Sequence, residues 1–595
     1  MIERKNIMAF KMLLILFLNI AYALKSLGEY REIEVDLPKP VFMKQEPLML
    51  DSQTYYYVNY DNEVIIKRGN KKVVINKNMP KEGDYAFLSA TTFNNLYILT
   101  FWYRNPPHKD VYVAAVDPKT LKVISFKELK SPDPVGKIRF FRVKDKLFIA
   151  WLDEKEPYKT YVSYTTDGEN WKKPIELGFS TDTGVIYSYK GKIYGATLGC
   201  EPKKLKKVDN KTKVEEWICG VFRAEFKKDK FGKLAISFED PLSWKGRGTP
   251  YNLQVVVSGD KVYYAYNVGG SPRVAIGENN ENFREVKIPT KWFTFYNLSD
   301  ITLFAEGEKI LIIGEARPTP DRLFIKKKDV AYNARWQPYA LYSEDAGKTW
   351  RETNLFGKYL DHEFFFTANP YRVKRYGSKI IVYWTDYRYI IPIPFIRISE
   401  DFGKTWKEES PLIEPYKVKG LYPHVEKFKD GYYIWFTVER KKKNSTEMDY
   451  NIGIVSLKDL SYVPLRDKYD EKYKEETLKK TIDAFYKALI EGNSKKIYSF
   501  FDPVFKEIYP YPVWENSRVK GIKFLEKKLI SVSRIGNVAV AYSTAKVELP
   551  KNVFGRFEVK GKRITNQKMY DVFVFIGGKW YLAVPKIGGG YFIEW

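Results

Sequence analysis

A short motif that recurs at long intervals constrains the fold of this 595-residue chain more than any other feature. Ser343 to Trp350 reads SEDAGKTW, and Ser399 to Trp406 reads SEDFGKTW. Thr165 to Trp171 reads TTDGENW, one residue shorter, and a weaker relative, GENNENF, ends at Phe283. In the clear copies the Asp can accept backbone N–H groups, the Gly permits a positive φ, and the aromatic ring can pack between sheets. The motif therefore predicts turns in a repeated β structure.

Apolar runs rich in β-branched and aromatic residues accompany these turns, and they predict strands. The clearest runs are NLYILTFWYR, KLFIAWLDE, KIYGATLGC, KVYYAYN, KILIIGEAR, KIIVYWTDYR and GYYIWFTVER. Seven such units lie between about Asp84 and Pro464. The segment YYYVNYDNEVIIKRGNKKVVI ahead of them could supply outer strands that close a ring. Short antiparallel sheets repeated radially make a β-propeller.

The motif at Ser343 and at Ser399 closely resembles the Asp-box of sialidase-like propellers. The resemblance implies a mainly β fold, with a six- or seven-bladed propeller over residues 30–462. In Asp-box proteins the motif staples turns and does no chemistry, so we expect structural roles for Asp345 and Asp401.

The pattern changes after about Ser461. Apolar residues on one face of Lys474 to Gly492 predict an amphipathic helix, and a second helix is expected over Ser494 to Ile508. Long strands follow, ending in GGKWYL. Helices followed by a curved antiparallel sheet resemble the nuclear transport factor 2-like (NTF2-like) cone. Residues 463–595 are therefore expected to form a small α+β domain with its own core, which could serve assembly as a homo-oligomer or hold a small ligand.

The amino terminus has the pattern of a secretory leader. Arg4, Lys5 and Lys11 precede the apolar run MLLILFLNI, and Ala21-Tyr22-Ala23 fits a cleavage site. We expect residues 1–23 to be a signal peptide, with an uncleaved anchor as the alternative. Either reading predicts an extracytoplasmic protein, secreted or associated with the cell surface.

Export makes a disulfide between the two cysteines plausible. Cys200 ends one strand-like run and Cys219 opens the next, so the bond would cross the base of a long hairpin. Two free buried thiols are the alternative.

The formal net charge of +27 indicates anionic partners. For an exported protein we expect an acidic glycan or another anionic surface ligand and no nucleic acid. A Lys/Glu-rich surface typical of heat-adapted proteins explains the charge equally well. The three histidines, His108, His362 and His424, share no metal-ligand spacing, and no metal or cofactor is predicted.

The resemblance to exo-sialidases implies a site in the last three units. In that family the last blade opens with a nucleophilic Tyr, followed by an Asp-Gly turn and a carboxylate at the next strand's end. Tyr422, Asp430-Gly431 and Glu439 match this order, although Pro423 replaces the Ser that often follows the Tyr.

Two substrate-binding arginines and an assisting acid are also expected from the family pattern. Arg388 lies ahead of one Asp-box and Arg317 ahead of another, where the family's third and second arginines stand. Asp300, in NLSDITLF, occupies the place of the Glu that assists the Tyr.

The earlier part of the family pattern fits less closely. Arg139 stands where the first arginine is expected, but Phe140-Phe141 replace Ile-Pro. The acid/base residue would come from the following loop, which offers Asp153, Glu154 and Glu156.

Such a site has a coherent chemistry. Three arginines would hold a substrate carboxylate, and a neutral Tyr would attack where a carboxylate nucleophile would be repelled. Two hypotheses follow: a retaining exo-glycoside hydrolase acting on terminal acidic sugars, or a non-catalytic propeller that binds glycan or protein. A solvated polar rim is the alternative to any site.

Overall fold

The computed structural model describes most of the chain. The described residues are 26–38, 46–105, 108–130, 134–153, 158–208, 211–240, 250–268, 271–289, 301–316, 337–353, 371–389, 391–415, 418–441, 448–465, 469–517, 521–550, 552–553, 557–558 and 564–583. The predicted leader lies outside these residues.

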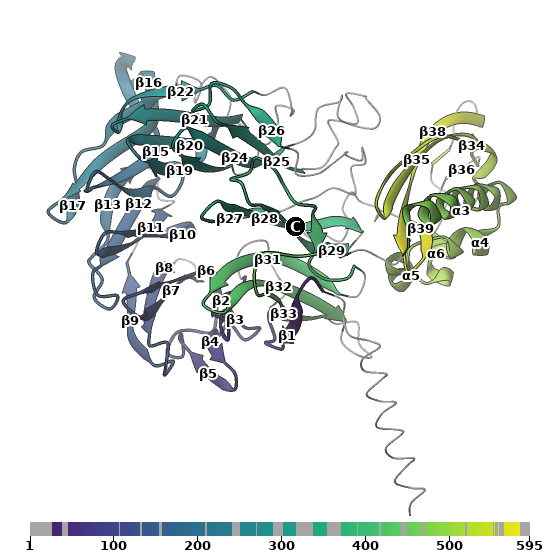
Figure 1. The fold of residues 1–595 in the computed structure, drawn as a ribbon, viewed down its shortest axis with the longest axis horizontal. Coiled ribbons are helices and arrows are strands. Elements are labelled where there is room, and N and C mark those ends of the chain that lie inside the picture. Colours follow the sequence, from purple (N-terminus) through teal and green to yellow (C-terminus); the bar gives the residue numbers. More distant parts are fainter. Residues whose placement is uncertain are drawn as a thin grey trace, which may run out of the picture.

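The described strands before residue 460 form eight antiparallel sheets that follow the chain order (Figure 1). The first four sheets contain β2 (Leu48–Asp51), β3 (Thr54–Val58), β4 (Val64–Arg68) and β5 (Lys71–Val74); β6 (Asp84–Phe93), β7 (Leu96–Asn105), β8 (His108–Val116) and β9 (Val123–Leu129); β10 (Pro134–Val143), β11 (Lys146–Asp153), β12 (Lys159–Thr165) and β13 (Ile175–Phe179); and β14 (Val185–Tyr189), β15 (Lys192–Val208), β16 (Lys211–Lys227), β17 (Lys230–Phe231) and β18 (Ala235–Glu239).

The other four sheets complete the series. They contain β19 (Pro250–Ser258), β20 (Lys261–Val268), β21 (Ser271–Glu278) and β22 (Glu281–Val286); β23 (Thr302–Glu306), β24 (Lys309–Ala316), β25 (Gln337–Ser343) and β26 (Arg351–Thr353); β27 (Arg372–Tyr376), β28 (Lys379–Tyr389), β29 (Ile391–Ser399) and β30 (Ser410–Pro411); and β31 (Lys419–Phe428), β32 (Gly431–Lys441), β33 (Met448–Leu457) and β1 (Glu29–Ile33).

The last sheet closes the ring with a strand from the other end of the chain. β1 pairs antiparallel with β33, with Tyr30 opposite Val455. This sheet then packs on the first one, since Trp435 and Ile452 share a buried cluster with Tyr55 and Tyr57. Sheets that succeed one another in chain order and then close in a ring define a β-propeller.

The number of sheets in the described residues exceeds the seven repeat units expected from the sequence. The segment expected to close the ring instead forms β3, β4 and β5 and builds a sheet of its own with β2. Its turn at Gly69, with φ 53°, lets β4 fold back on β5. The closing strand is the short, mostly polar EYREI of β1, which carries no strong strand pattern.

All four copies of the motif lie between the third and fourth strands of a sheet, as expected. In the copy after β29, Asp401 Oδ1 accepts the Thr405 N–H at 2.8 Å, and Ser399 Oγ accepts the Gly403 N–H at 2.7 Å. The copy after β25 repeats these bonds. Trp171 of the shorter copy is buried between sheets.

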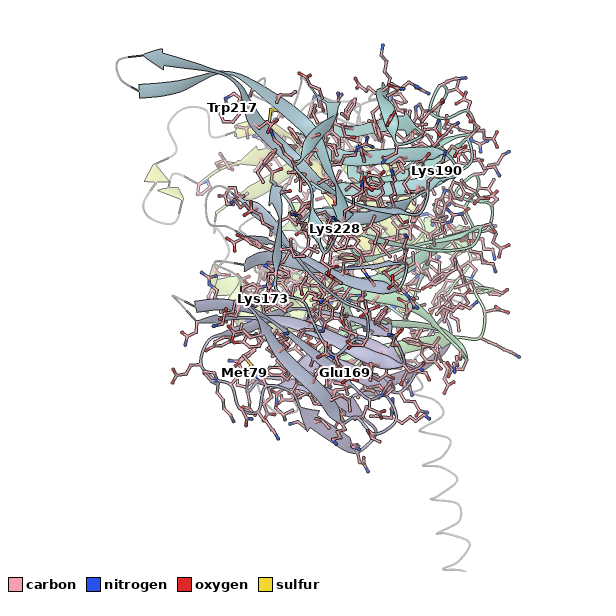
Figure 2. The ribbon with its side chains drawn as sticks, turned by 90° about the vertical axis from the view of Figure 1, so that its left-hand side faces the viewer. Met79, Glu169, Lys173, Lys190, Trp217 and Lys228 are labelled. Atoms are coloured by element: carbon pink, nitrogen blue, oxygen red, sulfur yellow. A yellow bond between two sulfur atoms is a disulfide. The ribbon has the colours of Figure 1, made fainter. Side chains whose placement is uncertain are left out.

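A disulfide joins Cys200 to Cys219, which stand directly opposite each other on β15 and β16. The two strands form the longest hairpin in the described residues, and part of it extends away from the other strands (Figure 2).

The described part of the carboxy-terminal segment contains four helices and then a sheet of order β34-β35-β38-β39. Its elements are α3 (Glu471–Glu491), α4 (Ser494–Ser499), α5 (Pro503–Ile508), α6 (Tyr511–Ser517), β34 (Lys523–Ile535), β35 (Val538–Glu548), β36 (Asn552–Val553), β37 (Phe557–Glu558), β38 (Ile564–Ile576) and β39 (Lys579–Leu582). The single second helix expected from the sequence is wrong. Asp502 caps a new helix by accepting the Phe505 N–H, and Pro503 cannot continue the previous one.

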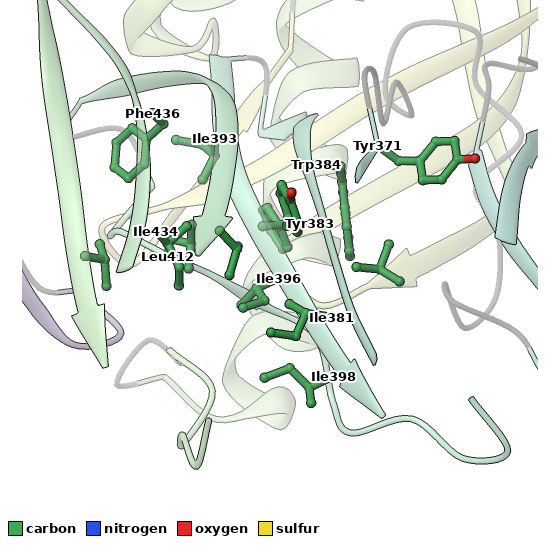
Figure 3. Packing of buried hydrophobic residues seen from close by; sticks show 14 of the residues in the cluster. Tyr371, Ile381, Tyr383, Trp384, Ile393, Ile396, Ile398, Leu412, Ile434 and Phe436 are labelled. Atoms are coloured by element: carbon green, nitrogen blue, oxygen red, sulfur yellow. The ribbon is translucent and has the colours of Figure 1, made fainter. Parts of the chain in front are cut away.

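The central strands β35 and β38 of the carboxy-terminal sheet contribute buried residues on both faces. Phe485 of α3 packs with Phe573 on one face. On the other face Val540 and Val572 belong to a cluster that also contains Trp384 and Phe436 of the propeller. Figure 3 shows the propeller part of this cluster around Tyr383 and Trp384. Separate cores were expected for the two parts, but one apolar cluster contains residues of both.

Candidate functional site

Tyr422 lies at an irregularity in β31, the first strand of its sheet. The pairing with β32 slips between Leu421 and His424, and Tyr422 has φ 54°. Its N–H donates to Thr385 Oγ1 of the preceding sheet at 2.9 Å. Burial, reinforced by Glu46 and opposed by Arg372, raises the pKa of Tyr422 to about 12. The phenol is therefore neutral at physiological pH.

Glu46, Arg372 and His424 form a compact polar cluster beside this tyrosine. Arg372 Nη2 forms an ion pair with Glu46 Oε2, and Arg372 Nη1 donates to the Pro423 carbonyl at 3.3 Å. His424 Nε2 lies 2.7 Å from the same Glu46 oxygen. Arg372 begins β27, His424 lies in β31 and Glu46 precedes β2, so the cluster spans three successive sheets of the ring.

The shifted pKa values of Glu46 and His424 determine which side chains of the cluster are charged at neutral pH. Burial alone would raise the pKa of Glu46, but Arg372 and His424 lower it to about 2. Burial and the neighbouring Arg372 charge lower the pKa of His424 to about 4. At neutral pH the site therefore holds an ionised Glu46, a charged Arg372 and a neutral His424.

One carboxylate oxygen of the cluster lacks a hydrogen-bond donor among the described residues. Glu46 Oε1 is buried, and no described residue gives it a hydrogen bond. A buried carboxylate oxygen without a donor is costly, and native proteins usually supply one. A hydroxyl of a ligand or of a catalytic side chain would satisfy it.

A second polar group lies along the same pair of strands. Glu426 of β31 accepts from Lys374 Nζ at 2.8 Å and from Tyr376 Oη at 3.0 Å, both of β27. The interface between these two sheets is thus polar over several residues.

The irregularity at Tyr422 has counterparts in other first strands. Phe87 of β6 and Asn252 of β19 also have positive φ at a slip in the pairing with the second strand. Two residues after Asn252, Gln254 donates to the Ile301 carbonyl next to β23, and two residues after Tyr422, His424 contacts Glu46. The slip in the strand pairing therefore recurs in several first strands. In β19 and β31 it precedes a residue whose side chain contacts a residue next to the following sheet.

Arg139 likewise links a first strand, β10 of the third sheet, to later parts of the ring. Its guanidinium donates to the Leu253 carbonyl at 2.9 Å and lies 3.6 Å from Asp182. Asp182 lies in the connection just before β14 of the fourth sheet, and Leu253 lies in β19 of the fifth. Among the described residues no contact brings Arg139 to Tyr422, so its expected role in the Tyr422 site is not supported.

The remaining predicted residues are dispersed or undescribed. Asp153 is buried at the end of β11, and Glu439 of β32 pairs with Lys419 at 2.6 Å. Asp300, Arg317 and Glu154 lie outside the described residues. Arg388 lies in β28, but its side chain is outside the described part.

Sequence reasoning missed Glu46 and Arg372. They are 326 residues apart, and neither belongs to a motif. Arg372 begins β27, the first strand of its sheet, and Arg139, which the sequence analysis singled out, lies in the first strand β10. This shared position was the one signal in the sequence that could have pointed to Arg372.

Within the described residues no cluster of three or more His, Cys, Asp or Glu side chains could hold a metal ion. The helices described here include none with the length and apolar character needed to cross a bilayer.

Comparison with known proteins gives only distant likenesses. No family model matches the chain, and no curated protein matches it significantly. A mutant of the NanB sialidase from Streptococcus pneumoniae is 9% identical, with 72% of this chain and 94% of that chain covered and a TM-score of 0.30. An α-L-arabinanase from Penicillium chrysogenum is 11% identical, with 56% and 95% covered and a TM-score of 0.32. The β-propeller domain of the Trilobed protease from Pyrococcus furiosus is 12% identical, with 65% and 100% covered and a TM-score of 0.32. At such low scores the propeller assignment rests on the strand pairing described above.

Proposed function

We propose that this protein is a glycan-acting propeller that hydrolyses terminal acidic sugars at Tyr422. The observation that carries the proposal is the polar cluster that Glu46 and Arg372 form with Pro423 and His424, directly after Tyr422 in β31, with Glu46 Oε1 unsatisfied among the described residues. Glu46 would take the assisting role that the sequence suggested for Asp300.

The proposed reaction uses this arrangement directly. Tyr422 Oη attacks the anomeric carbon and transfers its proton to Glu46, while the glycosidic C–O bond breaks and the leaving oxygen takes a proton from an acid. Water then cleaves the tyrosyl glycoside with net retention. A neutral nucleophile suits a substrate whose carboxylate would repel a carboxylate nucleophile.

Arg372 would act mainly on Glu46. Its ion pair keeps the carboxylate ionised, as a base requires. Binding of the substrate carboxylate would fall to Arg317 and Arg388, the two arginines predicted from the sequence.

Turnover of aryl glycosides of sialic acid and of glucuronic acid tests the proposal. Tyr422→Phe should lower kcat by roughly a thousandfold or more with little change in KM, because only the attacking oxygen is lost. Tyr376→Phe is the matched control, since it removes a hydroxyl bonded to Glu426 on the same strand interface. Equal turnover by wild type and Tyr422→Phe would reject the enzyme.

A non-catalytic glycan-binding propeller is the second candidate. The observation that favours it is the repeated tying role of Arg139, Gln254 and His424, which explains the slip at Tyr422 without chemistry. This candidate predicts that wild type and Tyr422→Phe bind an acidic glycan equally and that neither turns it over.

Both candidates include an extracytoplasmic location, for which the leader-like residues 1–23 are the support. The carboxy-terminal domain, with its NTF2-like order of helices and strands, is proposed to serve assembly or ligand binding. Cleavage of the leader and the oligomeric state in solution are the measurements that test these two points.

A further inference from the structure

A pocket of about 570 Å³ lies where the first and eighth sheets meet. Its walls come from Glu34–Asp36 after β1, from Asn59 and Asp61 in the turn between β3 and β4, and from Asp449 and Asn451 of β33. Figure 1 shows these strands together where the ring closes, and their buried residues share one apolar cluster. A volume of this size is typical of small-molecule sites, which range from about 300 to 1,000 Å³.

Backbone hydrogen bonds hold the walls of the pocket together. The Tyr60 N–H donates to the Asp36 carbonyl at 3.0 Å, and the Leu37 N–H donates to the Tyr450 carbonyl at 2.9 Å. Asp36 has φ 53°, a conformation that is uncommon for residues other than glycine and that the surrounding structure must support. The pocket is therefore preformed, and a ligand would not have to order its walls.

The charged groups of the pocket have both signs. They are Glu34, Asp36, Asp61 and Asp449 together with Lys67 and Lys72. Asp36 and Asp61 are exposed, and within the described residues neither carboxylate takes part in a hydrogen bond or an ion pair. These two carboxylates are therefore open to a ligand.

This mixture of charges favours a neutral ligand with many hydroxyl groups. The lysines would repel a cation and the carboxylates would repel an anion, whereas a hydroxyl can donate to a carboxylate and accept from an ammonium group. Within the described residues no acidic cluster is suited to a metal ion. Tyr60, between the lining residues Asn59 and Asp61, is 73% exposed, and such a ring offers a flat apolar face on which a sugar ring can stack.

The pocket and Tyr422 lie at the same face of the ring. In a four-stranded antiparallel sheet, the first strand begins at the end where the second strand turns into the third. Tyr422 is near the start of the first strand β31, and Asp61 is in the second-to-third turn of the first sheet. Asp36 and Glu46 belong to one connection, between β1 and β2. An oligosaccharide that runs across this face would contact both places.

We propose that this pocket binds a neutral sugar unit of an oligosaccharide. The proposal rests on the proposed function for its class of ligand and deepens it. The acidic end of the chain would react at Tyr422, while a neutral unit would be held between the first and eighth sheets. Holding the neutral unit requires no reaction, so binding and turnover can fail separately.

Calorimetric titration of the Tyr422→Phe protein tests the proposal without turnover. The probes are maltopentaose, cellopentaose, mannopentaose and galactopentaose, with spermidine as the cationic and polygalacturonate as the anionic comparison. At least one pentasaccharide should bind, and its affinity should change little with added NaCl because the ligand is uncharged. Replacing both Asp36 and Asp61 by Asn should weaken this binding by about tenfold or more, because two charge-assisted hydrogen bonds become neutral ones.

A matched variant replaces Asp145 and Asp260 by Asn. Their side chains are 72% and 73% exposed, and both lie in turns between a first and a second strand, at the opposite end of the sheets. This variant loses the same charge and should bind as its parent does. Equal affinity of the pocket variant and its parent would overturn the proposal, as would equal weakening in both variants.

Two further outcomes would also overturn it. One is that none of the four pentasaccharides binds, and the other is that spermidine or polygalacturonate binds more tightly than all of them. Pentasaccharide binding that depends on Asp36 and Asp61, in a protein whose wild type turns over no acidic glycoside, would keep the pocket and reject the hydrolase. Unchanged unfolding temperatures confirm that each variant is folded.

Discussion

Glu46 and Arg372 are 326 residues apart in the chain, yet they form an ion pair that contacts His424 of β31. The pair links the segment before the first sheet to the seventh sheet, and His424 of the eighth sheet joins it from between. The side chains of the pair are at most 17% exposed. The junction where the ring closes therefore depends on a nearly buried charge pair.

Glu46→Gln should destabilise the protein strongly. The substitution keeps the shape of the side chain but leaves the Arg372 charge nearly buried without its partner. Breaking a buried pair from one side typically costs about 3–5 kcal/mol. The free energy of unfolding in urea measures the loss.

The double variant Glu46→Gln/Arg372→Met supplies the control. It removes both charges, so it should recover a large part of the loss of the single variant. A double variant no more stable than the single one would show that the ion pair is not the cause.

Stability should fall as the pH is lowered from about 6.5 to about 4, and His424 should be one cause. Its pKa is about 4 in the folded protein and 6.5 in the unfolded chain, so in this range the unfolded state binds more protons. Glu46, with its pKa lowered to about 2, adds a further loss below its ordinary 4.5. Unfolding free energies should be measured at intervals across both ranges.

His424→Gln isolates the upper part of this effect. The variant keeps an N–H donor for Glu46 but cannot titrate, so its stability should vary less with pH between about 6.5 and 4. Identical slopes for the variant and the wild type would contradict the lowered pKa.

Asp401→Ala should lower stability without affecting turnover. Asp401 accepts the Thr405 N–H at 2.8 Å and the Thr405 hydroxyl at 2.6 Å, and the loss of such turn bonds costs about 1–2 kcal/mol. Thermal unfolding measures the first effect and the glycoside assay the second. A loss of activity in folded Asp401→Ala protein would refute the purely structural role.

Replacing Cys200 and Cys219 by Ser should destabilise the protein by about 3 kcal/mol in the chain-entropy account, given their separation of 19 residues. Comparing the unfolding free energy of the double variant with that of the wild type tests this effect.

Local patterns predicted much of the propeller correctly. Turn motifs such as Ser399 to Trp406, together with the apolar runs, located most second strands and the third-to-fourth-strand turns. These features are local, so the sequence displays them. The strand β1 escaped prediction because its partners, such as Val455, lie more than 400 positions away. The sequence indicated strands over β3 to β5 but not that they form a sheet of their own with β2.

The candidate site could be predicted from the sequence less completely than the fold. Tyr422 could be picked out from its order relative to Asp430 and Glu439, but its neighbours Glu46 and Arg372 could not. Their meeting results from closure of the ring, and no spacing in the sequence encodes it. Arg139 was picked out from its place in a repeat, and its described contacts are with Leu253 and Asp182 of later segments.

Covalent trapping of the proposed intermediate tests the central claim most directly. An acidic sugar fluoride with a second fluorine beside the anomeric centre should react with Tyr422 Oη, release fluoride and then hydrolyse slowly. The account predicts that the intact mass increases by one sugar residue and that the peptide containing Tyr422 carries the addition. The Tyr422→Phe variant should show no addition. Turnover of the parent glycoside with no adduct, or an adduct on another residue, would contradict the assignment of Tyr422 as the nucleophile.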